Sequence, residues 1–210
     1  KNYSICSNFI NCFSKFQSLI GTIKTRTDWN TKKFMIVGIF GSKGQGKTTY
    51  VIKKTLHYDI VLALCGSNEL LKRNFKLFDK KHIFKRTLFH EFSDVYEIIT
   101  QYHKLFRKHK TMIFFDDADF ILSSRFDKEL NSIFVFSRNY NFDIYYTCKR
   151  IKNLSSYVKF NTDTYVFFKY NAAFRDDLNF LSRDLQEKIL NLQKFQYIEI
   201  QVWHFCFNPL

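Results

Sequence analysis

The sequence predicts an α/β domain with a mainly parallel central sheet flanked by helices, preceded by a helical appendage at the N-terminus. Three observations lead to this prediction. Short, continuously apolar runs such as 34–40 are typical of strands buried on both faces. These runs alternate with stretches whose apolar residues follow helical spacing, which favours a parallel sheet. The chain has 210 residues, 46% of them hydrophobic, enough for one domain with its own core.

Residues 1–33 carry apolar side chains at the spacing of one amphipathic helix, so they are assigned to an N-terminal helical extension. This helix packs on the domain or on a neighbouring subunit, or it lies on a membrane surface. Residues 34–210 form the domain proper. Its strands are expected at 34–40, 59–64, 111–115, 142–147, 165–168 and 197–205, and its helices at 47–56, 95–106 and 126–137.

Composition limits the classes of partner and cofactor. The formal net charge of +14 favours a polyanion, either nucleic acid or an anionic membrane surface, although an A/T-rich coding genome would also accumulate lysine. Five cysteines without a C-x-x-C pair indicate neither a zinc site nor a disulfide framework. No apolar run reaches the 18 residues of a membrane span, so stable membrane insertion is not expected.

Residues 41–48 match the phosphate-loop pattern G-x-x-x-x-G-K-[ST], directly after a predicted strand and before a predicted helix. Glycines let the backbone curl so that successive N–H groups point at phosphate oxygens, and the helix N-terminus adds partial positive charge. Lys47 is expected to reach the β- and γ-phosphates as a catalytic residue, Thr48 to bind Mg²⁺, and Thr49 to contact the α-phosphate. The predicted nucleotide-binding residues are Gly41, Ser42, Lys43, Gly44, Gln45, Gly46, Lys47, Thr48 and Thr49.

Two carboxylates follow the apolar run 111–115, where a strand reaches the carboxyl edge of the sheet. In nucleoside triphosphatases with a phosphate loop an aspartate at this place holds Mg²⁺, and Asp116 takes that role. Asp117 is the candidate base that orients or deprotonates the attacking water. Asp119 is interpreted as a helix cap or a surface group.

Arg138 closes a helical stripe on the side of the domain away from its own phosphate loop, so it is a candidate to act in a neighbouring subunit's site. The alternative is a solvent-exposed arginine at a helix end, and Arg125 and Arg150 compete for the role. Thr147 and Lys149, at the end of strand 142–147, are candidates to sense the state of the nucleotide.

Three basic clusters with interleaved aromatic residues follow the second predicted strand. They form either a sequence-independent surface for DNA or solvated helix faces, and the sequence leaves both open. The clusters are Lys72/Arg73/Lys76, Lys80/Lys81/Lys85/Arg86 and Lys104/Arg107/Lys108/Lys110.

Over residues 34–205 the order of motifs resembles the HerA/FtsK superfamily, specifically the small genome-packaging ATPases of membrane-containing icosahedral viruses. The likeness lies in the segments 40–49, 115–117, 136–154 and 161–168. Two departures are Lys149 in place of the usual sensor glutamine, and Asp117 where the second acid is often glutamate.

This resemblance implies a RecA-like domain that hydrolyses ATP with Mg²⁺ and forms a ring, commonly hexameric. It also implies translocation of double-stranded viral DNA without sequence preference into a preformed capsid. Capsid or portal-vertex proteins would then be partners, in the host cytoplasm or at the packaging vertex of the virion.

Two other functions stay open on the sequence alone. A nucleoside or nucleotide kinase has a phosphate loop and similar length, although the arginine-rich lid of such kinases is not recognisable here. A phage morphogenesis protein with a phosphate loop would act at a membrane and would normally bring a spanning segment.

Overall fold

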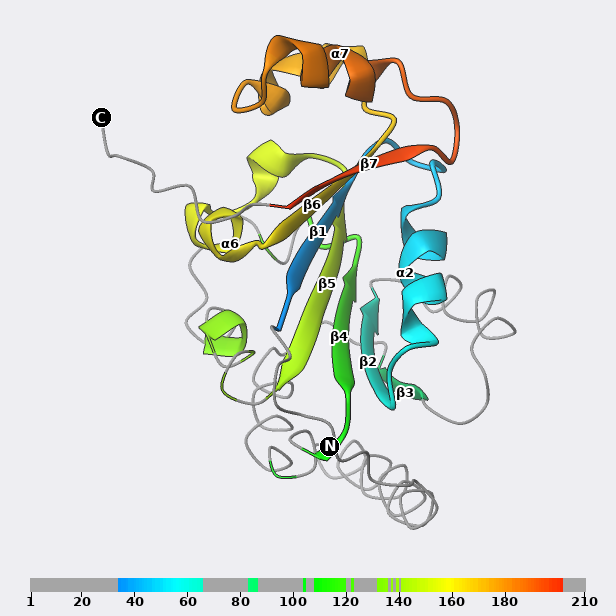
Figure 1. Ribbon diagram of the computed structural model, residues 1–210, viewed down its shortest axis with the longest axis vertical. Helices are drawn as coiled ribbons and strands as arrows, with labels where there is room; N and C mark the ends of the chain where they lie inside the picture. The colour runs from blue at the N-terminus through cyan, green and yellow to red at the C-terminus, as the bar shows by residue number, and fades with distance from the viewer. Residues whose placement is uncertain are drawn as a thin grey trace, which may run out of the picture. The chain divides into compact units, whose positions relative to one another are not determined.

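The computed structural model describes residues 34–65, 83–86, 104, 108–119, 122, 132–135, 137, 139 and 141–201, with the backbone alone at 64, 65 and 83–86. These residues form a seven-stranded sheet in the order β3-β2-β4-β5-β1-β6-β7 (Figure 1). Every neighbouring pair is parallel except β6 and β7, which are antiparallel. The strands are β1 Ile36–Phe40, β2 Ile60–Cys65, β3 Ile83–Arg86, β4 Thr111–Asp116, β5 Phe142–Cys148, β6 Thr164–Phe168 and β7 Tyr197–Gln201.

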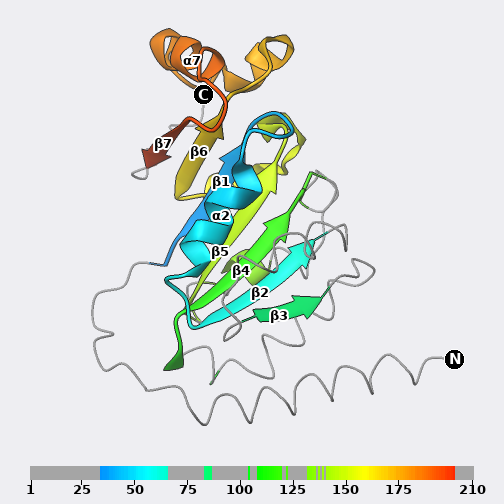
Figure 2. The ribbon, with the colours of Figure 1, turned by 90° about the vertical axis from the view of Figure 1, so that its right-hand side faces the viewer.

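The central strands β1, β4, β5 and β6 are buried at every position, as their continuous apolar runs predict. Helix α2 (Lys47–Thr55) covers one face, where its Val51 packs with Val37 and Phe114 (Figures 1 and 2). On the opposite face Phe134, from the helical residues 132–135, stacks on Phe115 with ring centroids 6.4 Å apart. The predicted α/β class is therefore confirmed.

At the amino ends of the strands, three aspartates accept backbone N–H groups from a neighbouring segment. The bonds run from Lys110 N to Asp59 (2.8 Å), from Met35 N to Asp143 (2.9 Å) and from Ile36 N to Asp163 (2.8 Å). The backbone N–H groups at the start of a strand lack a ladder partner, so these carboxylates satisfy donors that would otherwise lose hydrogen bonds on folding. Each bond also ties a strand to the segment beside it.

Several short elements follow β5 and were not predicted. They are η1 Ile151–Asn153, α6 Ser156–Asn161, η2 Ala172–Leu178 and α7 Arg183–Leu190. Helix α6 begins at an N-cap in which Ser155 Oγ accepts a hydrogen bond from Val158 N. Segment η2 and helix α7 lie beyond the carboxyl ends of the parallel strands, and a turn then leads back into β7 (Figure 2).

Some expected elements lie outside the described residues. These are the helical extension 1–33, the helix 95–106 apart from Lys104, residues 126–131 and 136 of the helix 126–137, and residues 202–205 of the terminal strand. None of the helices that the structure describes has the length and apolar character needed to cross a bilayer.

Candidate nucleotide-binding site

The loop between β1 and α2 curls tightly because three of its glycines adopt backbone angles that disfavour other residues. Gly41, Gly44 and Gly46 have φ angles of 142°, 76° and 101°. At Gly41 there is also no room for a side chain, since a Cβ there would lie 2.8 Å from Phe168 Cβ. The loop therefore has the curved backbone that a phosphate group requires.

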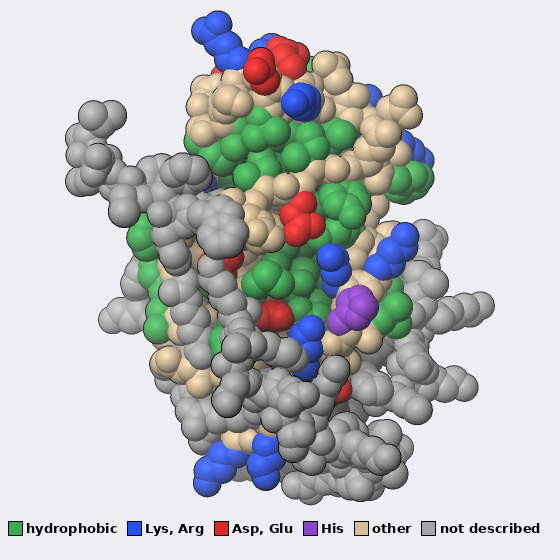
Figure 3. Space-filling view, in the orientation of Figure 1, with side chains coloured by type: hydrophobic (Ala, Val, Ile, Leu, Met, Phe, Trp, Pro, Cys, Tyr) green, Lys and Arg blue, Asp and Glu red, His purple; other side chains and the backbone are tan. Residues whose placement is uncertain are grey.

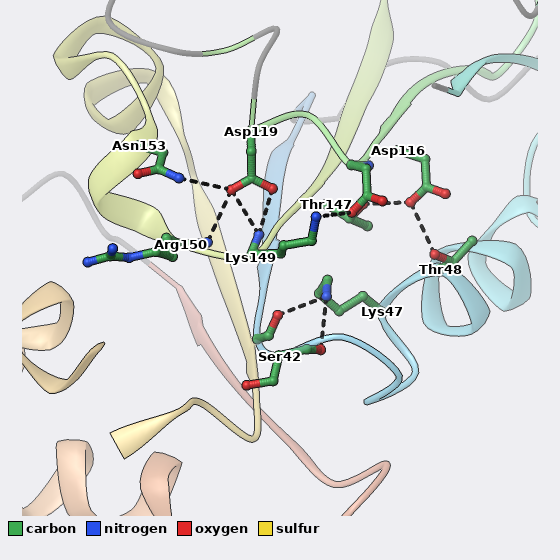
Figure 4. A network of polar contacts seen from close by, with 11 residues as sticks. Ser42, Lys47, Thr48, Asp116, Asp119, Thr147, Lys149, Arg150 and Asn153 are labelled. Carbon is green, nitrogen blue, oxygen red and sulfur yellow. Dashed lines mark hydrogen bonds and ion pairs between the residues drawn. The ribbon is translucent and has the colours of Figure 1, made fainter. Parts of the chain in front are cut away.

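Lys47 begins helix α2 and returns its side chain into the loop (Figure 4). Its Nζ donates hydrogen bonds to the carbonyl oxygens of Gly41 (2.8 Å) and Ser42 (3.1 Å). Burial lowers the pKa of this amine, and the nearby carboxylates, Asp117 most strongly and then Asp116, oppose that shift. The lysine is thus held within the curve of the loop, where a phosphate would bind.

The other predicted nucleotide-binding residues, in the loop or in the first turn of α2, lie in different environments. Lys43 and Thr49 are exposed, and Ser42 and Thr48 are half-buried. The Gln45 side chain places its Oε1 in a buried position with no hydrogen-bond partner.

Asp116, the last residue of β4, lies at the centre of a polar cluster. Its Oδ1 accepts hydrogen bonds from Thr48 Oγ1 (3.1 Å) and Thr147 Oγ1 (2.6 Å), so three chain segments meet at one oxygen (Figure 4). The residue is 2% exposed, and its Oδ2 is buried without a hydrogen-bond partner. Burial raises the pKa of this carboxyl group, while the bonds from Thr147 and Thr48 act in the opposite direction.

A buried carboxylate oxygen without a partner is costly, and a cation is the group that would best satisfy it. Within the described part of the chain no three His, Cys, Asp or Glu side chains gather into a metal-binding group. Mg²⁺ commonly takes one or two protein ligands together with substrate phosphates and water. The pair Thr48 and Asp116 beside the phosphate loop fits that donor set.

Asp117 turns away from the strand direction, with a left-handed φ of 50°. Its backbone N–H donates to Thr147 Oγ1 (2.9 Å), and its Oδ1 lies 3.9 Å from Lys149 Nζ. Both of these charged side chains are about half exposed, 47% for Asp117 and 48% for Lys149. The second acid is therefore open to water at the edge of the sheet, whereas Asp116 is enclosed.

Thr147 and Lys149, the two sensor candidates, occupy different environments. Thr147 is fully buried and bridges Asp116 to the backbone of Asp117, whereas the half-exposed ammonium of Lys149 lies near the half-exposed carboxylate of Asp117. Asp119 accepts hydrogen bonds from the backbone N–H groups of Lys149 (2.9 Å) and Arg150 (3.3 Å). It thus caps the turn after β5.

Of the three candidate arginines, the described residues include Arg150 alone; Arg125 and Arg138 lie outside them. The Arg150 guanidinium forms a bidentate ion pair with Asp177 (2.7 and 2.9 Å), and it stacks 4.1 Å from the Phe174 ring centroid. Tyr170 donates a third hydrogen bond to Asp177 (3.1 Å). Arg150 is therefore held by residues of its own chain, an arrangement that sequence spacing gave no reason to expect.

The basic clusters are described only at a few positions. Lys104 and Lys108 are exposed, whereas Lys110 is half-buried with its Nζ 4.4 Å from the centroid of the Tyr58 ring. The contact of the Lys110 ammonium with this ring explains the lysine without a DNA partner. The remaining members lie outside the described side chains.

Solved structures with similar folds include two that carry a packaging function in their names. The genome packaging NTPase B204 of Sulfolobus turreted icosahedral virus 2, in complex with AMP, has a TM-score of 0.64 at 15% identity, covering 82% of this chain and 94% of B204. B204 of Sulfolobus turreted icosahedral virus, a DNA-packaging ATPase, has a TM-score of 0.62 at 16% identity, covering 80% and 92%. The chain has the fold of a P-loop ATPase.

A third structure with this fold is EssC (ATPases 2 and 3) from Geobacillus thermodenitrificans, with a TM-score of 0.60 at 11% identity, covering 80% of this chain and 38% of EssC. The resemblance to genome-packaging ATPases that the sequence predicted is thus confirmed at the level of the fold. Structures of B204 from Sulfolobus turreted icosahedral virus 2 in complex with ATP-γS and with AMPPCP are similar to this chain as well. No protein-family model matches the chain, and no curated protein matches it at a significant level.

Proposed function

We propose that this chain is an ATP-hydrolysing translocase for double-stranded DNA, and that it packages a viral genome into a preformed capsid. The observation that carries the proposal is the cluster of Thr48, Asp116 and Thr147 around one carboxylate oxygen, with the second oxygen of Asp116 buried and unpaired beside the phosphate loop. The fold shared with two B204 packaging enzymes supports the choice of reaction.

Each residue of the site has a distinct task in this proposal. Backbone N–H groups of the loop bind the phosphates of ATP. An ammonium group has three N–H donors, and Lys47 gives two of them to loop carbonyls, so the third is available to a phosphate oxygen. Thr48 and Asp116 hold Mg²⁺, which when bound neutralises charge that develops on the phosphates.

Asp117 is the proposed base. Its carboxylate is half exposed and follows directly after the enclosed Asp116, so it can accept a proton from a water molecule that approaches the terminal phosphate. Lys149, 3.9 Å away, keeps a positive charge beside that carboxylate. Thr147 orients both acids at once, because its hydroxyl donates to one and accepts from the backbone of the other.

The motor part of the proposal rests on charge and on the shared fold. A net charge of +14, with exposed Lys104 and Lys108 on the described surface, suits contact with a DNA backbone independent of sequence. We place the chain in a ring, taken as a hexamer, in which Arg138 reaches the neighbouring subunit's site. Capsid or portal-vertex proteins are its proposed partners, in the host cytoplasm or at the packaging vertex.

The test is ATP hydrolysis measured alone, with double-stranded DNA of two unrelated sequences, and with nucleoside acceptors. We expect both DNA sequences to raise turnover equally, and the effect to weaken as salt rises. Lys47→Ala should abolish turnover, and the matched control Lys53→Ala, an exposed lysine on the same helix, should keep it. Transfer of phosphate to a nucleoside acceptor would show that the chain is a kinase. A rate of hydrolysis that DNA does not change at any salt concentration would refute the translocase function.

A further inference from the structure

Phe195 lies in an unusual place for an aromatic residue. It is the third residue of a turn closed by a hydrogen bond from Gln196 N to Gln193 O (3.1 Å), and its φ is 69°. A positive φ at this position of a turn normally selects glycine or asparagine, because a bulky side chain is strained there. The residue is nevertheless 61% exposed, so burial of apolar surface does not explain its presence.

The turn brings this ring against the phosphate loop. A Cβ placed on Gly46 would lie 2.8 Å from Phe195 Cδ1 and 3.5 Å from its Cε1. Gly46 directly precedes Lys47 and is the N-cap of α2. An exposed aromatic ring thus borders the residue at which the phosphate loop becomes a helix, and hydrophobic side chains are visible at the surface between α7 and β7 (Figure 3).

The sheet order determines which end of a nucleotide meets this ring. Asp116 and Thr147 belong to β4 and β5, which lie on one side of β1, so the terminal phosphates and any Mg²⁺ that Thr48 and Asp116 would hold lie toward those strands. The α-phosphate and the nucleoside must then leave the loop away from those strands. Strands β6 and β7 lie on that opposite side of β1, and the Phe195 turn leads directly into β7.

We propose that the Phe195 ring is the surface on which the base of the bound nucleoside triphosphate stacks, an inference that rests on the proposed function. Every base has a π-face, and stacking on an aromatic side chain needs no hydrogen-bond pattern. The exposed Lys194 has its Nζ 5.1 Å from the ring centroid, and its long, flexible stem would let it move aside for a base. The site therefore prefers purines, which stack over a larger area, to pyrimidines.

The experiment compares two ligands on the full chain by calorimetry: ATP-γS, which has a base, and tripolyphosphate, which has none. Phe195→Gly removes the ring and at the same time suits the left-handed backbone, so the melting temperature should rise or stay unchanged. We expect this variant to bind ATP-γS roughly tenfold more weakly, and tripolyphosphate as tightly as the wild type. Phe195→Trp should keep the affinity for ATP-γS, and the preference for ATP over CTP should shrink only in the glycine variant.

Phe160→Ala is the matched control, because Phe160 is also an exposed aromatic, at 76%, but lies on α6, ahead of β6 in the chain. Unchanged ATP-γS affinity in Phe195→Gly would overturn the inference. An equal loss for ATP-γS and tripolyphosphate would overturn it too, because the ring would then shape the loop and not hold the base. Failure of the wild type to bind either ligand would instead refute the proposed nucleotide site itself.

Discussion

The buried hydroxyl of Thr147 offers the sharpest test of the site, because valine has the same shape without the oxygen. In the wild type this hydroxyl donates to Asp116 Oδ1 (2.6 Å) and accepts from Asp117 N (2.9 Å). Thr147→Val removes both bonds and leaves no cavity. Thr147→Ser, which keeps the hydroxyl, is the matched control.

The expected loss of stability follows from these two bonds. A hydrogen bond to a charged group contributes about 2 kcal/mol, and the N–H of Asp117, left without a partner in a partly buried place, costs about 1 kcal/mol more. The free energy of unfolding should therefore fall by about 3 kcal/mol in Thr147→Val. Thr147→Ser, which keeps the hydroxyl, should retain most of the free energy of unfolding of the wild type.

The pH dependence adds a second, independent readout. Burial already raises the pKa of Asp116, and the bond from Thr147 is the strongest effect that opposes the rise, so its removal raises the pKa further. A carboxyl group with a raised pKa in the folded state stabilises the fold most below its unfolded pKa, and that contribution is lost as pH rises through the folded pKa. The stability deficit of Thr147→Val should accordingly be smaller at acid pH than at about pH 8.

Urea denaturation at several pH values measures the deficit, and the pH profile of Mg²⁺-dependent ATP hydrolysis measures the site. Because metal binding needs the ionised carboxylate, the acidic limb of that profile should move to higher pH in Thr147→Val. A valine variant as stable as the wild type, with its acidic limb unmoved, would refute the reasoning that Thr147 positions Asp116.

Two further predictions concern residues that support the site. Asp177→Asn should lower the free energy of unfolding by about 2 kcal/mol, because the amide that replaces the buried carboxylate cannot form the ion pair with Arg150. Although burial raises the pKa of Asp177, the bonds from Arg150 and Tyr170 lower it overall. The greater stability of the wild type should therefore be lost as pH falls through the pKa of Asp177, as measured by urea denaturation at several pH values. A difference in stability that does not change with pH would contradict this account. Gly38→Ala would place a Cβ 2.5 Å from Tyr146 Oη, and it should cost about 2 kcal/mol by overpacking, measured as a lower melting temperature; an unchanged one would mean that Tyr146 moves freely.

The sequence was sufficient to predict the central strands because those strands are buried on both faces and are mostly apolar, although β5 carries Asp143 near its start. Strand β3 escaped prediction, since two of its four residues are Lys85 and Arg86, as is common at a sheet edge. The short helix α6 was also missed, although Ser155 at its N-cap was a recognisable signal. The order of the strands is set by contacts between distant segments, which a local pattern does not contain.

The residues of the candidate site also fall into those that the sequence predicted and those that it did not. The phosphate loop and Asp116 were predictable because each depends on a contiguous motif after a buried strand. The pair Arg150 and Asp177 joins residues 27 positions apart with no motif between them. Phe195 was unpredictable for a different reason, because its backbone conformation runs against the preference of its own residue type.

The three aspartates that hold the amino ends of the strands have a consequence for how this protein can change. Asp59, Asp143 and Asp163 fasten neighbouring segments together at the end of the sheet remote from the phosphate loop. The carboxylates at the amino ends of the strands thus stabilise the sheet, whereas Asp116 and Asp117 lie beside the phosphate loop. Stability and nucleotide chemistry can therefore be altered separately, because a substitution at one of these aspartates leaves the residues of the phosphate loop unchanged.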